Sequence, residues 1–258
     1  MAPQLPPLDL HAHINTRTKP ADLERLGAVV FAATRSLDEY ESAKKRRDQV
    51  TIWGVGCHPR LPEAQLGYDS ARFAALISSA PYVSEVGLDR HSKVPLDEQM
   101  HVFSSILDIL RTTPRITSIH SAAVPRQTLD VLERHPIKGA VLHWWRGNET
   151  QTRRALELGC WFSVNNASMK HPDHISAIPL DRILTETDHP SGDRGSPIPR
   201  QPGAVMDVEN NLAAIHGSTA ADIRKQVWTN FVKLLDETAV ASLLPIPVQR
   251  MVAAARNF

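Results

Sequence analysis

The chain has 258 residues, of which 42% are hydrophobic and 22% are charged, which is ordinary for a globular protein and excludes a wholly disordered or fibrous chain. Its 29 Lys and Arg residues and 28 Asp and Glu residues give a net charge of +1 at pH 7. Overall charge therefore offers no argument for a nucleic-acid partner, and any such partner must be argued from local sites.

Strand-like runs of β-branched and apolar residues alternate with segments of helical periodicity along the chain. The predicted strands span residues 7–13, 28–34, 51–57, 82–87, 115–120, 139–144, 160–165 and 182–188. The predicted helices span residues 21–26, 37–47, 69–79, 96–110, 125–134 and 149–158, followed by 207–215, 220–235 and 247–255. The stretch after the seventh strand has room only for a stunted helix. Residues 189–203, dense in Pro, Gly and Arg, predict a long loop.

Eight strands alternating with helices predict right-handed βαβ units and a parallel sheet. The chain is close to the roughly 250 residues that one eight-stranded α/β barrel needs. No repeat, linker or low-complexity tract divides it. We therefore expect an α/β protein with a (β/α)8 barrel, a single domain over residues 1–258 with C-terminal helices from about residue 207.

The sequence also bears on the cellular compartment. No apolar run approaches the ~18 residues of a membrane span, and the N-terminus lacks a signal-peptide pattern. Two cysteines, Cys57 and Cys160, cannot form a disulfide framework. We expect a cytoplasmic protein without a membrane partner.

Twelve histidines are many for this length, and several stand with acids at the ends of predicted strands. Asp9, His11 and His13 alternate at the end of the first strand, so their side chains share one face. The other residues of this kind are Glu85 in the fourth strand, His120 in the fifth, His143 in the sixth, and Glu186 and Asp188 in the eighth. In a parallel barrel these strand ends gather at one mouth, where reactive groups lie.

Four imidazoles and two carboxylates in one buried volume are costly unless divalent cations compensate them. A single histidine at a strand end, such as His120, is more often a structural side chain, and Glu85 alone can be an ordinary loop acid. The shared position of all six residues favours metal binding. Imidazole and carboxylate ligands suit Zn²⁺, Mn²⁺, Fe²⁺ or Co²⁺ better than Ca²⁺.

At these residues the sequence resembles the TatD-like branch of the metal-dependent hydrolase (amidohydrolase) superfamily. The matching segments are DLHAH at 9–13, GCHP at 56–59, SEVGLD at 84–89, IHS at 119–121, VLHWW at 141–145, ILTETD at 183–188 and TNFVKLL at 229–235. Four longer segments resemble the TatD-like nucleases of the Qat anti-phage defence system: RITSIHS at 115–121, VLHWWRG at 141–147, ALELGCWFSV at 155–164 and RILTETDHP at 182–190.

The resemblance implies a barrel with a two-metal site, metal-dependent DNase activity, and other Qat proteins as partners. It implies that His11, His13 and Asp188 hold one metal, that His120 and His143 hold the second, and that Glu85 bridges both. It also implies that His58 lines the pocket near the phosphate.

Two positions depart from the family pattern. The family often has an arginine just after the fifth-strand histidine, whereas Ser121, Ala122 and Ala123 follow His120 here. A phosphate contact is therefore missing or supplied by Arg60, Arg146 or Arg194. The second departure is His189, which follows Asp188 and would ligate a metal, block the pocket or face solvent.

A third group of candidates lies just after the sixth strand. Trp144 and Trp145 can stack an unpaired base there, and Arg146 can meet a phosphate. The alternative for each tryptophan is that it packs under the barrel rim.

For catalysis, we expect a pair of metal ions, Mg²⁺/Mn²⁺ or Zn²⁺, to activate water, with Asp188 as general base and Glu85 and His58 beside it. The alternative for Asp188 is a plain metal ligand. Asp9 and Glu186 are expected to orient imidazole N–H groups from behind, although Asp9 can also be an ordinary strand acid.

The substrate predicted is DNA, as a single strand or strand end, cleaved by an exonuclease-like reaction. Two other functions remain open. One is hydrolysis of a small or modified nucleotide, lactone or amide, and the other is a non-catalytic subunit of a defence complex that binds nucleic acid or a partner.

Overall fold

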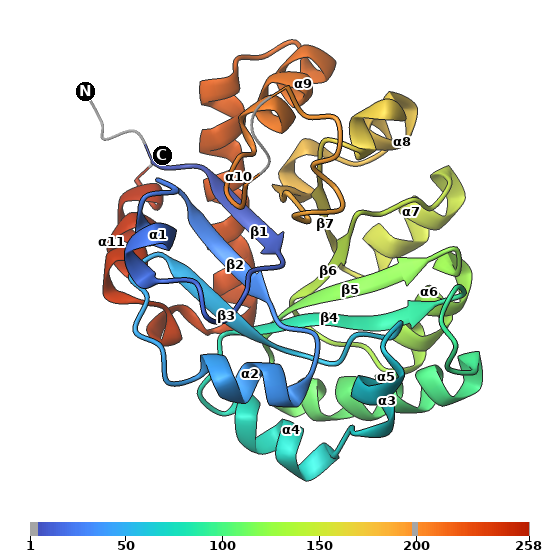
Figure 1. The fold of residues 1–258 in the computed structure, drawn as a ribbon. Helices are drawn as coiled ribbons and strands as arrows, with labels where there is room; N and C mark the ends of the chain where they lie inside the picture. Colours follow the sequence, from blue (N-terminus) through green and yellow to red (C-terminus); the bar gives the residue numbers. More distant parts are fainter. Residues whose placement is uncertain (1–4, 198–200, 258) are drawn as a thin grey trace.

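A computed structural model describes residues 5–197 and 201–257, and it contains eight parallel strands that pair in chain order, as predicted (Figure 1). The strands are β1 (Leu8–Ala12), β2 (Val29–Ala33), β3 (Thr51–Gly56), β4 (Tyr82–Asp89), β5 (Ile116–Ala122), β6 (Ala140–His143), β7 (Trp161–Val164) and β8 (Ile183–Thr185). Every residue of β1, β2 and β3 is buried, because the sheet is covered on both faces. The (β/α)8 barrel fold is confirmed.

Helices connect the strands and lie outside them (Figure 1). They are α1 (Pro20–Glu24), α2 (Leu37–Ala43), α3 (Pro62–Leu66), α4 (Ser70–Ile77), α5 (Leu96–Thr112), α6 (Pro125–Arg134), α7 (Glu149–Glu157), α8 (Pro172–Ser176), α9 (Met206–His216), α10 (Ala220–Thr238) and α11 (Ile246–Ala255). Three short 3-10 helices are η1 (Ser168–Lys170), η2 (Leu180–Arg182) and η3 (Ala241–Leu243). The five-residue α8 is the stunted helix expected after the seventh strand, whereas the five-residue α3 was not predicted. None of the helices in the described ranges is long and apolar enough to cross a membrane.

The eighth strand is shorter than predicted, because after Thr185 the backbone hydrogen-bonds alternately to the two neighbouring strands, β7 and β1. The amide of Glu186 donates to Val164 O on β7 at 3.0 Å, and that of Asp188 donates to His11 O on β1 at 2.8 Å. A further bond runs from His13 N to His189 O at 2.9 Å. These contacts close the ring between β8 and β1 and carry Asp188 to the barrel mouth.

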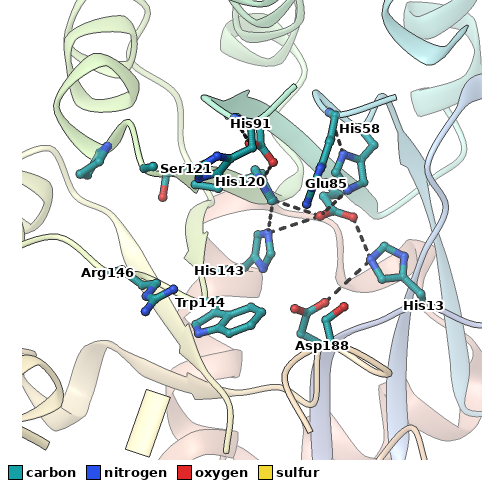
Figure 2. A pocket seen from close by; sticks show the side chains of 16 residues that line it. His13, His58, Glu85, His91, His120, Ser121, His143, Trp144, Arg146 and Asp188 are labelled. Carbon is teal, nitrogen blue, oxygen red and sulfur yellow. Dashed lines mark hydrogen bonds and ion pairs between the residues drawn. The ribbon is translucent and has the colours of Figure 1, made fainter. Parts of the chain in front are cut away.

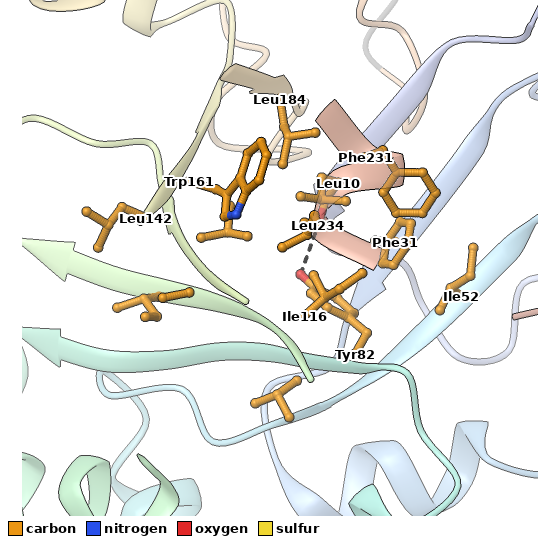
Figure 3. Close-up of a cluster of buried hydrophobic side chains, with 14 of the residues drawn as sticks. Leu10, Phe31, Ile52, Tyr82, Ile116, Leu142, Trp161, Leu184, Phe231 and Leu234 are labelled. Carbon is orange, nitrogen blue, oxygen red and sulfur yellow. Dashed lines mark hydrogen bonds between the residues drawn. The ribbon is translucent and has the colours of Figure 1, made fainter. Parts of the chain in front are cut away.

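Each strand contributes to the apolar cluster drawn in Figure 3. The labelled side chains are Leu10, Phe31, Ile52, Tyr82, Ile116, Leu142, Trp161 and Leu184 from β1 to β8, with Phe231 and Leu234 from α10. Helix α10 contacts both β1 and β5, which lie on opposite sides of the ring, so it crosses one end of the barrel. Asn230 Nδ2 donates to Ile183 O at the start of β8, so the closed end is the one where the strands begin.

The opposite end, where the strands finish, is open to the loops. The first residues of the predicted loop 189–203 lie on this side, because His189 pairs with the end of β1. No helix or strand occurs in its described parts, 189–197 and 201–203, and residues 198–200 lie outside the described ranges.

Candidate metal centre

The side chains predicted to bind metal meet at the open end of the barrel, and Figure 2 labels all of them except His11. His11 and His13 come from the end of β1, Glu85 from β4, His120 from β5, His143 from the last position of β6, and Asp188 from just beyond β8. Their potential ligand atoms form groups of three that lie within 4.8 Å of one another. The sequence therefore predicted a set of side chains that the fold brings together.

Glu85 lies at the centre of the cluster, and its two carboxylate oxygens face different partners. Its Oε2 lies 2.8 Å from His13 Nε2 and 3.8 Å from His11 Nε2. Its Oε1 lies 3.0 Å from His58 Nε2, 3.1 Å from His120 Nδ1 and 3.7 Å from His143 Nε2. One carboxylate thus connects two halves of the site.

Glu85 does not end its strand, as the sequence suggested, but lies inside β4, which continues to Asp89. Its φ of 40° is unusual for a residue with a side chain, and the pairing of β4 with β5 shifts between Val83 and Val86. This irregularity turns the Glu85 side chain towards the mouth. Left-handed backbone conformations of this kind cluster at functional sites, and Trp144 (φ 41°) and Asp188 (φ 44°) share them.

The two histidines of β1 are oriented through their Nδ1 atoms. His13 Nδ1 lies 3.0 Å from the carbonyl oxygen of Ala33, so in the neutral ring Nδ1 carries the proton and Nε2 presents a lone pair to the cluster. His11 Nδ1 lies 2.7 Å from Ser118 Oγ and 3.2 Å from the Tyr82 hydroxyl. Both imidazoles are thereby aimed with Nε2 towards Glu85.

His120 is reversed relative to these two. Its Nε2 lies 3.0 Å from Asp89 Oδ2, which leaves Nδ1 facing Glu85 and, at 3.1 Å, His143 Nε2. Asp89 is buried and was not assigned a role from the sequence, although it ends the SEVGLD segment in which Glu85 was recognised. The position of Asp89 in that segment is the sequence feature from which its role could have been predicted.

His58 differs from His13 and His120 because the nitrogen that it turns towards Glu85 is the one that carries the proton. Its Nδ1 accepts a hydrogen bond from the Arg60 amide at 3.0 Å, so in the neutral ring the proton resides on Nε2. That Nε2 faces Glu85 Oε1. In this tautomer His58 is a hydrogen-bond donor at the pocket wall and has no lone pair for a cation there.

The residues fit a divalent cation. His11 Nε2 is buried without a hydrogen-bond partner in the described structure, although it points into the cluster. Buried polar atoms are otherwise nearly always paired, so an unpaired ring nitrogen beside two carboxylates is what a metal ligand requires. The cluster can hold a metal ion.

The pKa values of the acids describe a site that needs positive charge. Burial raises the pKa of Asp188 well above its ordinary value, and the charges of Glu85 and Glu186 raise it further. Burial also acts to raise the pKa of Glu85, but the imidazoles around it outweigh burial and hold that pKa well below its usual range. Glu85 is therefore ionised because imidazoles surround it, and a bound cation can supply the same positive charge.

The histidines also fall into two groups, one with lowered and one with raised pKa values. Burial lowers the pKa of His143 to about 3 and that of His11 well below its usual value, so both rings are neutral, as metal ligands must be. Burial acts to lower the pKa of His13 and His120 as well. Their acidic neighbours, Glu85 for both and Asp89 for His120, outweigh it and raise each pKa to about 9.

The two acids expected to orient imidazoles do not hydrogen-bond to them. Asp9 accepts bonds from Thr187 Oγ1 at 2.6 Å and from the Gly203 amide at 2.7 Å, so it ties the closing segments together. Glu186 Oε1 lies 3.9 Å from His143 Nδ1 and accepts instead from the Trp144 amide and Asn165 Nδ2, both at 3.0 Å. Alternation along a strand placed both acids correctly, but backbone amides at the closure compete for their oxygens.

The cluster forms the floor of a pocket of about 430 Å³. Three of the predicted substrate residues, Arg60, Trp144 and Arg146, line it. Trp145 does not, because it is buried and its Nε1 donates to Thr152 Oγ1 at 2.9 Å, as the alternative of packing under the rim anticipated. His189 does not line it either, and its Nδ1 lies 2.8 Å from Asp193 Oδ2.

The two departures from the family pattern can now be located. Ser121, Ala122 and Ala123 line the pocket where the family often has an arginine. Among the described residues, His189 belongs to none of the groups that could hold a metal, and its backbone carbonyl accepts from His13 N at the barrel closure.

Comparisons with known proteins agree with this geometry. The chain matches the family described as TatD related DNase over residues 8–236. It is 26% identical over 205 residues to the "Uncharacterized metal-dependent hydrolase YcfH" of Escherichia coli K12, covering 73% of this chain and 74% of that protein. It is 31% identical over 176 residues to the "3'-5' ssDNA/RNA exonuclease TatD" of Cronobacter sakazakii, covering 63% and 66% respectively.

A solved structure shows the same fold. YJJV, a TatD homolog from Escherichia coli K12, superposes with a TM-score of 0.79 at 20% identity, over 91% of this chain and 98% of that chain. Since the family match spans all eight strands and every proposed ligand, the chain belongs to the TatD-related DNase family and is a metal-dependent hydrolase that acts on ester bonds.

Proposed function

We propose that this protein is a nuclease that hydrolyses phosphodiester bonds at the ends of single-stranded DNA. The observation that carries the proposal is Glu85, whose two oxygens face two different sets of imidazoles at the floor of an open pocket. The relative named as a single-strand exonuclease supports the choice of substrate.

The division of ligands around Glu85 supports a two-cation site. His11 and His13 lie on the side of Oε2, with Asp188 Oδ1 3.8 Å from the Nε2 atom of each, and His120 and His143 lie on the side of Oε1. We assign these as the two ligand sets, with Glu85 shared between them. Mg²⁺ and Mn²⁺ suit phosphodiester chemistry, and four imidazoles favour Mn²⁺ or Zn²⁺ by ligand type.

When bound, such cations polarise the phosphoryl oxygen and lower the pKa of the attacking water. Asp188 would accept the proton of that water, because its carboxylate faces the cluster and lies beside the imidazoles that would hold a cation. The Nε2–H group of His58 faces Glu85 in this structure, and it is placed to donate a hydrogen bond to a phosphate oxygen instead. No covalent intermediate with the protein is needed.

Recognition of a strand end, rather than of long duplex, follows from the charge and size of the site. A chain of net charge +1 has no surplus of cations with which to track a duplex backbone. A pocket of about 430 Å³ is of the size that binds a small ligand such as one nucleotide. Linear single strands should therefore be degraded and circular ones spared, and equal cleavage of both would contradict the exonuclease assignment.

The test of the activity is cleavage of end-labelled single-stranded DNA, duplex DNA and RNA with Mg²⁺, Mn²⁺ or Zn²⁺. Glu85→Gln keeps the side-chain shape but removes the charge that both ligand sets share, so cleavage should fall at least about 100-fold. Glu63→Gln, at an exposed site on α3, is the matched control and should retain full activity. If wild-type protein shown to hold metal cleaves no nucleic acid, the hydrolase acts on a small or modified substrate instead.

We further propose that the nuclease works in the cytoplasm in anti-phage defence, together with other Qat proteins. The support is the resemblance of residues 115–121, 141–147, 155–164 and 182–190 to Qat nucleases. Plaque counts on cells that carry the whole gene cluster should rise when Glu85→Gln replaces the wild type. If protection against phage were unchanged, the catalytic site would have no role in defence.

A further inference from the structure

A short turn after β6 forms one wall of the pocket, and it presents an aromatic face next to a cation (Figure 2). Trp144 is half-buried and lines the pocket, and Arg146 is exposed with its Cζ 6.0 Å from the centre of the Trp144 ring. Within the described residues, the Arg146 guanidinium makes no hydrogen bond and no ion pair with an acid. Apart from the Trp144 ring, this positive charge therefore has no partner among the described residues.

The turn is held in a strained conformation by buried groups. Trp144 has a φ of 41°, which costs energy for a residue with a large side chain. Its amide donates to Glu186 Oε1, and Glu186 is fully buried and further bonded by Ser163 and Asn165. A buried carboxylate network thus holds the backbone of Trp144 at the edge of the pocket that its side chain lines.

The next residues anchor the turn from the other side. Trp145 packs into the core against Phe162 and bonds to Thr152. Gly147 follows, and a Cβ there would lie 2.1 Å from the Trp145 ring, so only glycine lets the chain pass. Two adjacent tryptophans therefore have different roles, one as an anchor in the core and the other as a surface of the pocket.

An aromatic face and an unpaired guanidinium match the two parts of a nucleotide. Unpaired bases stack on exposed aromatic rings regardless of sequence, and arginine binds phosphate. Both groups lie in the same pocket as the proposed ligands Glu85, His143 and Asp188. The reacting phosphodiester and this wall can therefore be occupied by neighbouring parts of one strand.

We propose that Trp144 and Arg146 form a subsite for one unpaired nucleotide adjacent to the bond that is cleaved, with the base stacked on the Trp144 indole and its phosphate paired with Arg146. The subsite rests on the proposed nuclease function and specifies its substrate as a strand with unpaired bases at its end. In this subsite Arg146 supplies a phosphate contact that Ser121, Ala122 and Ala123 do not provide in the place of the family's arginine.

Binding can be tested apart from catalysis in the metal-free protein with EDTA. Two short single-stranded oligonucleotides carry 2-aminopurine, a fluorescent base that is quenched by stacking, at one end or the other. Wild-type protein should quench one of them. Trp144→Ala should lose the quenching and weaken binding roughly 5- to 100-fold, whereas Trp144→Phe should keep part of both.

Arg146→Ala should weaken binding about 3- to 5-fold without abolishing quenching. Its matched control is Arg111→Ala, an exposed arginine in the last turn of α5, which should bind as wild type does. Circular dichroism of each variant confirms its fold. Quenching and affinity within twofold of wild type for Trp144→Ala would overturn the subsite.

Activity then separates the subsite from the proposed function. With metal, wild type should cleave a normal oligonucleotide faster than the same oligonucleotide with two abasic sites at each end, and Trp144→Ala should remove that difference. A difference that persists in Trp144→Ala would also overturn the subsite. If wild type cleaves neither substrate, the nuclease proposal fails while the fluorescence result still decides the subsite.

Discussion

At the scale of single residues, Asp89 determines how His120 faces the cluster. Its Oδ2 lies 3.0 Å from His120 Nε2, and its own position is fixed by the amide of His91, which donates to Oδ1 at 2.6 Å. Asp89→Asn keeps the shape but loses the charge that holds the imidazole proton. We expect metal affinity to fall about 10- to 100-fold, since partners behind metal-bound histidines contribute that much. Titration calorimetry with Mn²⁺ or Zn²⁺ measures it.

The control for that change is Asp97→Asn, an exposed acid in the first turn of α5. Metal affinity of Asp97→Asn should equal that of wild type. If Asp89→Asn also bound metal within twofold of wild type, the contact would only help pack the β4 and β5 ends, and His120 would be oriented by Glu85 alone.

Residue identity predicted which side chains gather at the barrel mouth, but not the groups that orient them. His11 and His13 could be recognised because alternation on one strand puts both on the same face. Their supports could not, because Tyr82 and Ser118 lie 71 and 107 residues from His11 in the chain. For Asp9 the position was right and the contact was not, since amides of a distant loop reach its carboxylate first.

At the scale of elements, the irregular β4 places the central carboxylate. Gly87 has a φ of 134°, and a Cβ there would lie 2.2 Å from the backbone oxygen of His120. Gly87→Ala should therefore push β4 away from β5 and destabilise the fold by about 3 kcal/mol or more. Urea unfolding measures this free energy, and metal affinity should fall with it because Glu85 moves.

The substitution Gly159→Ala measures the cost of backbone strain without the steric clash expected at Gly87. Gly159 also has a positive φ, of 78°, but nothing lies within 4 Å of a Cβ built there. Its substitution should cost only about 1–2 kcal/mol of backbone strain. Equal losses at the two positions would show that the close approach of β4 to β5 has no energetic weight.

Element types were predictable where the pattern was long, as in α5, and α6 (Pro125–Arg134) matches its predicted bounds, whereas most other boundaries differ by one or more residues. The bulge at Glu85 was not predicted, because β4 (YVSEVGLD) mixes polar residues and a glycine with its apolar ones, and this composition does not indicate where its pairing with β5 shifts. The early end of β8 depends on hydrogen bonds that pass alternately to β7 and β1, which only the closed ring provides. Helix α3 is too short for helical periodicity to indicate it.

At the scale of the whole molecule, charge sets how the enzyme meets its substrate. The chain is close to neutral, and its positive groups at the mouth include two arginines, Arg60 and Arg146, whose guanidinium groups have no acid within ion-pair distance in the described structure. The ligand cluster itself is a balance of imidazoles and acids. Attraction to a strand should therefore be local to the pocket and weak over long distances.

The salt dependence of catalysis tests this picture. For single strands, the logarithm of affinity falls with the logarithm of salt concentration by about 0.7 per phosphate contact, so two arginine contacts predict a slope near −1.4. Arg146→Ala should reduce that slope by about 0.7, whereas Arg111→Ala should leave it unchanged. The measurement is kcat/KM on single-stranded DNA in increasing NaCl at saturating metal. A slope steeper than about −4 would mean that the protein grips many phosphates along the strand, and the preference for strand ends would then need another cause than its charge.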